Sequence, residues 1–157
     1  MKIKIGIADD QQLFLRSLSN LINSFKDFEV VVEALNGEEL LKQLGMLKTL
    51  PDIILVDVQM PVMDGPSTVA KITVAYPSVR TVALSMKEDD HSILSMLRAG
   101  CSAYLLKDLH PRELEKALIE VQETGYFNSD TFNMHYRRLL RKMKVKKLNL
   151  ATAKKHF

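Results

Sequence analysis

One stretch constrains the fold of this chain more than any other, the segment Asp52–Gly65. Four apolar residues stand in a row at Ile53–Val56, and a short continuous run of this kind is typical of a strand covered on both faces, as in a parallel sheet. The run ends on the carboxylate of Asp57, and Pro61 cannot continue a central strand. The stretch therefore predicts a buried strand whose exit carries a lone acid.

The acid at this exit has two interpretations. Open α/β sheets bind their ligands at the carboxyl edge of the strands, which makes Asp57 a candidate functional residue. Asp is also common in turns, so the alternative is that Asp57 merely caps the exit of the strand. Asp64 and Gly65 predict a turn after it, and Pro66 suits the first position of a helix.

The remainder of the chain alternates between strand and helix patterns. Four further strands are predicted at Lys2–Ala8, Phe28–Ala34, Val79–Leu84 and Ser102–Leu106. Apolar residues recur at helical spacing after each strand, over Leu13–Phe25, Leu40–Leu47, Val69–Val74, Ile93–Leu97 and Leu114–Val121. Five strands alternating with five helices predict an α/β fold of βαβ units around a parallel sheet. Right-handed crossovers would place helices on both faces of this sheet.

Composition limits the classes of protein that this chain can be. A length of 157 residues with 46% apolar and 26% charged residues fits one globular domain with a tail. The apolar runs are the length of strands, which predicts no membrane span, and the early charges from Lys2 to Asp10 leave no room for a signal peptide. The single Cys101 cannot form an internal disulfide, so a cytoplasmic location is expected.

The charges divide the chain into two parts. Residues 1–127 carry 13 Lys and Arg against 18 Asp and Glu, whereas residues 128–157 carry 9 against 1. This shift predicts a domain over 1–127 and a basic tail over 128–157 with a different role.

Polar residues follow four of the five predicted strands. They are Asp9 and Asp10, then Asp57, Ser85 and Lys107. If the first and third strands are neighbours, three carboxylates meet in one cleft, and their repulsion calls for a cation. Mg²⁺ prefers such oxygen ligands, and Lys107 and Ser85 could hold an anion beside them. This set of groups favours phosphoryl transfer to Asp57, which would form an aspartyl phosphate.

These residues carry a resemblance to a known family. Residues 1–127 resemble the receiver domain of bacterial two-component response regulators, which implies an α/β fold of the flavodoxin-like (βα)5 class with a parallel sheet of order 2-1-3-4-5. Asp9 and Asp10 match its acidic pair, and Asp57-x-x-Met60-Pro61-x-x-Asp64-Gly65 matches its phosphoacceptor motif. Ser85, Lys107 and Tyr104 stand at its hydroxyl, lysine and switch-aromatic positions. The motif around Asp57, in register with the other strand ends, makes the resemblance specific.

The resemblance implies a role for each of these residues. Asp57 would accept a phosphoryl group from a histidine kinase. Asp10, Asp57 and the backbone carbonyl of Gln59 would bind Mg²⁺, and Asp9 would assist through water. Lys107 and Ser85 would hold the phosphoryl oxygens, while an inward turn of Tyr104 would shift the surface around it. Homodimerisation on phosphorylation is expected by the same analogy.

Two rival functions remain open. A pseudo-receiver that binds partners without phosphorylation is favoured by Met86, because a bulky residue after Ser85 would narrow access to the site. A phosphatase-like enzyme with an Asp nucleophile would want a second acid two residues on, where this chain has Gln59. We therefore expect a phosphoacceptor and not a turnover enzyme.

The basic tail also has two interpretations. Residues 125–129 resemble the exit from the last receiver helix in regulators of the LuxR/NarL type. Apolar residues recur at helical spacing after them among many Lys and Arg residues, which fits either a DNA-binding arm or a linker helix. A linker is favoured because thirty residues are too few for an independent helix-turn-helix domain. Transcription control through DNA would then need a domain beyond Phe157.

Overall fold

The computed structural model describes residues 1–126. The described residues belong to the first of two units of the chain, Met1–Phe127. The predicted linker helix in 128–157 lies outside the described residues, so it stays a prediction.

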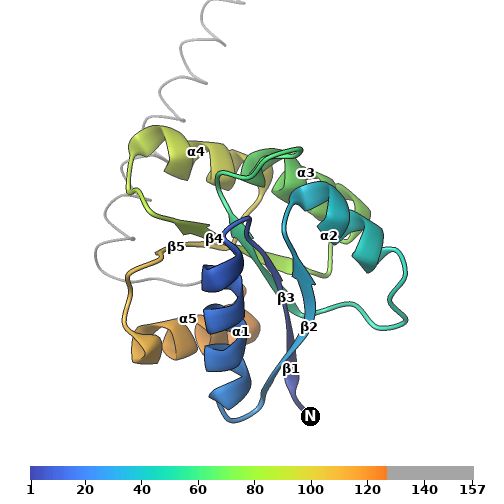
Figure 1. The fold of residues 1–157 in the computed structure, drawn as a ribbon, viewed down its shortest axis with the longest axis vertical. Coiled ribbons are helices and arrows are strands. Elements are labelled where there is room, and N and C mark those ends of the chain that lie inside the picture. The colour runs from blue at the N-terminus through green and yellow to red at the C-terminus, as the bar shows by residue number, and fades with distance from the viewer. Residues whose placement is uncertain (127–157) are drawn as a thin grey trace, which may run out of the picture. The chain divides into compact units, whose positions relative to one another are not determined.

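Five strands and five helices alternate along residues 1–126 (Figure 1). The strands are β1 (Ile3–Ala8), β2 (Phe28–Ala34), β3 (Ile53–Asp57), β4 (Arg80–Ser85) and β5 (Ala103–Leu106). The helices are α1 (Gln12–Ser24), α2 (Gly37–Leu44), α3 (Gly65–Ala75), α4 (Asp90–Ala99) and α5 (Pro111–Thr124). All neighbouring strands pair in parallel, in the order β2-β1-β3-β4-β5, which confirms the predicted fold class.

The helices cover both faces of the sheet, with α1 and α5 on one face and α2, α3 and α4 on the other (Figure 1). Because β3 lies in the middle of the sheet, all five of its residues are buried. Ile53 and Leu55 belong to the core beneath α1 and α5, and the side chains between them alternate to the opposite face. The continuous apolar run of this strand therefore follows from its burial on both sides.

Some expectations for the elements were wrong in detail. Helix α2 ends at Leu44, so Leu47 lies outside it. Leu13 and Val74 are 83% and 85% exposed, although both stand at helical spacing with inward residues. Leu13 is two residues from the buried Leu15, and Val74 is two residues from the buried Ile72. Two residues correspond to about 200° around a helix, so both side chains lie on the side opposite the buried face.

The loop between β3 and α3 is held by local contacts at the sheet edge. The Asp64 carboxylate accepts a hydrogen bond of 2.8 Å from the backbone N–H of Ser67, so it caps α3. A Cβ atom on Gly65 would lie 2.4 Å from the backbone oxygen of Asp57 and 2.7 Å from the Cα of Val58. Only glycine therefore allows the start of α3 to pack this closely against the end of β3.

The loop between α2 and β3 lies away from the edge where the strands end. It exposes Met46, whose exposed fraction is 79%.

Within residues 1–126 the structure holds no helix with both the length and the apolar character needed to cross a bilayer.

Candidate functional site

The strand exits meet at one edge of the sheet, as parallel pairing requires. Asp9 and Asp10 follow β1, Asp57 ends β3, Ser85 ends β4, and Lys107 follows β5. Carboxylate oxygens of Asp9, Asp10 and Asp57 all lie within 4.8 Å of one another. The structure therefore brings the predicted acids together, although they come from separate parts of the sequence.

The ammonium group of Lys107 lies inside this acidic cluster. Its Nζ is 2.7 Å from Oδ2 of Asp9 and 3.4 Å from Oδ2 of Asp57. The Lys107 side chain is 4% exposed and that of Asp9 is fully buried, so this ion pair is shielded from water. A buried charge needs such a partner, and one ammonium offsets part of the charge of three carboxylates.

The same ammonium contacts two residues of the N-terminal part of the chain. Lys107 Nζ donates a hydrogen bond of 2.8 Å to Oε1 of Gln11. It also lies 4.6 Å from the centre of the Phe14 ring, in cation–π geometry. The backbone N–H of Gln11 in turn donates a 2.8 Å hydrogen bond to Oδ1 of Asp9.

The anionic form of the Asp57 carboxyl is unfavourable in this site. Burial, followed by repulsion from Asp9, raises its pKa from 3.8 to about 7, and attraction to Lys107 opposes the rise. The cluster thus carries more negative charge than its own cation neutralises. A hard divalent cation with oxygen ligands would relieve this imbalance.

Ser85 and Tyr104 bind the same loop residue from two sides. Ser85 Oγ accepts a 3.0 Å hydrogen bond from the backbone N–H of Lys87, and the Tyr104 hydroxyl donates a 2.7 Å hydrogen bond to the Lys87 carbonyl. Ser85 and Tyr104 are 6% and 5% exposed, so the aromatic ring is turned into the protein. Burial also raises the pKa of the Tyr104 hydroxyl.

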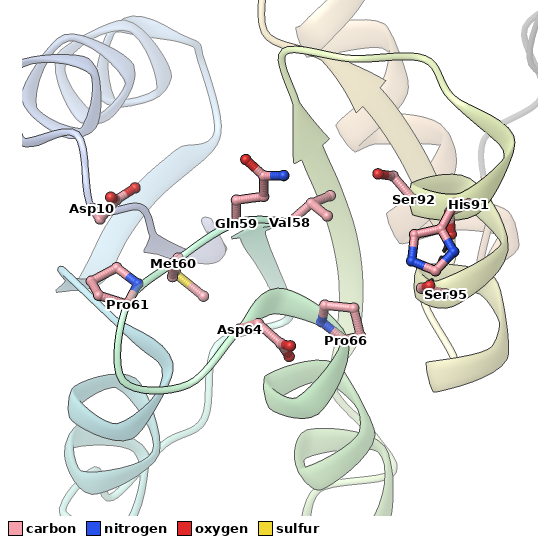
Figure 2. A pocket seen from close by; sticks show the side chains of 10 residues that line it. All are labelled: Asp10, Val58, Gln59, Met60, Pro61, Asp64, Pro66, His91, Ser92 and Ser95. Carbon is pink, nitrogen blue, oxygen red and sulfur yellow. Dashed lines mark hydrogen bonds between the residues drawn. The ribbon is translucent and has the colours of Figure 1, made fainter.

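Two cavities adjoin at this edge. A cavity of about 210 Å³ is lined by Asp57, Ser85 and Lys107 together with Met86, which is 73% exposed and so lies at its rim. A wider hollow of about 480 Å³ lies beside it. Figure 2 shows its lining: Asp10, Val58, Gln59, Met60, Pro61, Asp64 and Pro66 on one side, with His91, Ser92 and Ser95 of α4 across from them.

The comparisons agree with this geometry. The family model described as the response regulator receiver domain matches residues 5–119. The chain belongs to this family. It is 36% identical over 123 residues to the transcriptional regulatory protein LnrK of Bacillus subtilis (strain 168), covering 78% of this chain and 55% of that protein. It is 36% identical over 114 residues to the nitrate/nitrite response regulator protein NarL of Escherichia coli (strain K12), covering 73% of this chain and 52% of that protein.

A solved structure is also similar to this receiver domain. It is the signal receiver domain of the response regulator NarL from Mycobacterium tuberculosis, with 27% sequence identity and a TM-score of 0.73. The match covers 78% of this chain and 98% of that one. The predicted relation to regulators of the LuxR/NarL type is thus confirmed, and the chain spans about half the length of the curated relatives it matches.

Several contacts of the receiver site could not be found from the sequence. Gln11 and Phe14 reach Lys107 from a segment almost a hundred residues away, and no spacing rule predicts that contact. Lys87 takes part through its backbone, which sequence patterns do not reveal. His91 is exposed, as its position near a helix start suggests, yet it lines the wider hollow.

Proposed function

We propose that this receiver domain accepts a phosphoryl group on Asp57 from a histidine kinase, with Mg²⁺ held by Asp10, Asp57 and the backbone carbonyl of Gln59. The observation that carries the proposal is the cluster of three carboxylates, of which Asp9 and Asp57 are buried and lie beside the ammonium of Lys107. Asp9 would take part through water. This arrangement fits a nucleophilic carboxylate whose surroundings stabilise added negative charge.

The donor set fits Mg²⁺ on chemical grounds. The three acids offer hard oxygen ligands within 4.8 Å of one another, and Lys107 alone does not balance their charge. Mg²⁺ commonly binds one or two carboxylates and retains several waters, which agrees with a cluster open to a cavity. When bound, the ion would offset negative charge on the phosphoryl oxygens.

The protein's own groups then perform the transfer. A carboxylate oxygen of Asp57 attacks the phosphorus, the phosphorus–nitrogen bond to the kinase histidine breaks, and its electron pair returns to the imidazole. Lys107 pairs with a phosphoryl oxygen. The Ser85 hydroxyl already accepts a hydrogen bond from Lys87, so its own hydrogen is available to another phosphoryl oxygen.

The output of the domain is a further part of the proposal. Relatives such as LnrK are named transcriptional regulators, and this chain covers about half of their length. We propose that phosphorylation controls transcription through a DNA-binding domain outside the described residues, with homodimerisation as the intermediate step. Sedimentation before and after phosphorylation tests the dimer, and an unchanged coefficient would reject it.

Intact mass spectrometry tests the central proposal. The receiver is mixed with Mg²⁺ and a small acyl phosphate, and we expect one phosphoryl adduct that hydrolyses with time and does not turn over a generic phosphomonoester. Asp57→Asn should form no adduct, whereas the control Asp27→Asn, a change at an exposed position, should form it normally. An equal adduct on Asp57→Asn, or none on the wild type, rejects the proposal.

The alternative is a pseudo-receiver that binds partners without phosphorylation. Met86 favours it, because this residue stands at the rim of the cavity that contains Asp57. Chemical shifts of the strand-exit residues during a Mg²⁺ titration separate the two functions. Changes centred on Asp10 and Asp57 favour the phosphoacceptor, and no change favours the pseudo-receiver.

A further inference from the structure

We infer that Gln11 and Phe14 are positioning residues that aim the Lys107 ammonium at the phosphoryl group on Asp57. The inference rests on the proposed function and adds to it two residues with no assigned role in that chemistry. It depends on three features of the structure: the number of donors on Lys107, the surroundings of its ammonium, and the place of the two residues in the fold.

The ammonium is already held by two neighbours on the side of Gln11 and Asp9. A lysine ammonium has three N–H donors. Lys107 Nζ donates a 2.8 Å hydrogen bond to Gln11 and forms an ion pair of 2.7 Å with Asp9, while Asp57 is farther away at 3.4 Å. The hydrogen bond to Gln11 occupies one donor and leaves others for the group on Asp57. An arriving phosphoryl oxygen can therefore accept from the ammonium without displacing Gln11.

Phe14 closes the other side of the ammonium. Its ring centre lies 4.6 Å from Lys107 Nζ, and the two residues line a common cavity with Leu18, Leu21, Leu84 and Leu114. The ring attracts the cation and replaces water on that side, so the long side chain is held toward the site. The 4% exposure of the Lys107 side chain is consistent with this confinement.

Gln11 also connects the lysine to the acid pair. Its side-chain oxygen accepts from Lys107 while its backbone N–H donates to Asp9 at 2.8 Å. One residue thus fixes both members of the shortest ion pair in the site. Phe14 follows within the first turn of α1, so the start of this helix holds the lysine that β5 delivers.

The first test is the rate of phosphorylation of the whole chain by a small acyl phosphate at saturating Mg²⁺. Phe14→Leu, which keeps the apolar volume but removes the ring, should slow adduct formation roughly two- to fivefold. Gln11→Ala should slow it by about the same factor, and the double variant roughly tenfold. Phe14→Tyr, which retains the ring, should keep most of the rate.

Matched controls separate positioning from general loss of packing. Leu21→Ala removes apolar volume from the same cavity two turns along α1, and Gln12→Ala changes an exposed neighbour of Gln11. We expect Leu21→Ala to lower stability and both controls to leave the phosphorylation rate unchanged. Slowing by Leu21→Ala equal to that by Phe14→Leu would overturn the inference.

A spectroscopic readout does not depend on phosphorylation. The side-chain NMR signals of Lys107 should show a ring-current shift from Phe14 that disappears in Phe14→Leu and persists in Phe14→Tyr. If the wild type forms no adduct but these signals behave as expected, the proposed function fails while the positioning contact stands. If the wild type forms an adduct and the variants match it in rate and signal, the inference fails alone.

Discussion

The charge of Asp57 should make the metal-free receiver less stable as the pH rises. The folded protein holds the Asp57 proton up to a pKa of about 7, whereas the ordinary value is 3.8. Between these values the folded state retains a proton that the unfolded chain has lost. The stabilisation is thus complete below pH 3.8 and is lost as the pH rises toward 7.

The size of this effect follows from the two pKa values. At about 1.4 kcal/mol per pH unit, their difference corresponds to about 4 kcal/mol as an upper limit. The part of this free energy that is lost between pH 5 and pH 8 is roughly 2 to 3 kcal/mol. Asp57→Asn removes the titrating group and keeps nearly the same volume. Its free energy of unfolding should therefore lack this fall with pH.

Urea unfolding of both proteins in EDTA, followed by circular dichroism at pH 5, 6, 7 and 8, measures the difference. The other titrating groups are common to both proteins, so their contribution cancels in the difference between the two free energies of unfolding. The control Asp27→Asn should show the pH dependence of the wild type, because it changes only an exposed carboxyl. Saturating Mg²⁺ at pH 8 should restore stability to the wild type and much less to Asp57→Asn. Parallel curves for the wild type and Asp57→Asn would refute the reasoning.

Three further predictions concern other parts of the receiver. Thr81→Val should raise the free energy of unfolding by about 1 kcal/mol, because the buried Thr81 hydroxyl has no hydrogen-bond partner among the described residues. A lower free energy of unfolding for Thr81→Val, measured with urea, would contradict this. Val62→Gly should also stabilise by about 1 kcal/mol, since Val62 has a φ of 70°, whereas Val74→Gly in α3 should destabilise by a similar amount. Burial raises the pKa of the Cys101 thiol to about 12, so an alkylating reagent should modify it roughly a hundredfold more slowly in the native than in the urea-unfolded protein, and equal rates would oppose this.

The sequence predicted the scaffold well because the scaffold depends on local patterns. The continuous run Ile53–Val56 corresponds to the fully buried strand β3, and the predicted strands β1, β4 and β5 begin within one residue of the observed ones. The convergence of the acids also followed from topology, since parallel strands deliver their carboxyl ends to one edge. Their assigned roles as ligands and phosphoacceptor stay predictions.

What the sequence did not predict depends on the direction of single side chains across the fold. Phe14 was placed among the apolar residues of a helix, but its ring contacts Lys107. Met86 lines the cavity that contains Asp57, with 73% of its surface exposed, so its expected effect on access to the site stays a prediction. Periodicity identifies which residues share a face, and it does not state which distant residue each one meets.

The site is built from two separate portions of the chain, because β1 pairs directly with β3 in the middle of the sheet. A cut in the exposed loop around Met46 would leave the acidic pair on one fragment, and Asp57, Ser85 and Lys107 on the other. Neither fragment alone would hold a working centre. Fused to two interacting partners, the fragments would regain phosphate acceptance only when reunited, which makes this receiver a candidate for a split reporter.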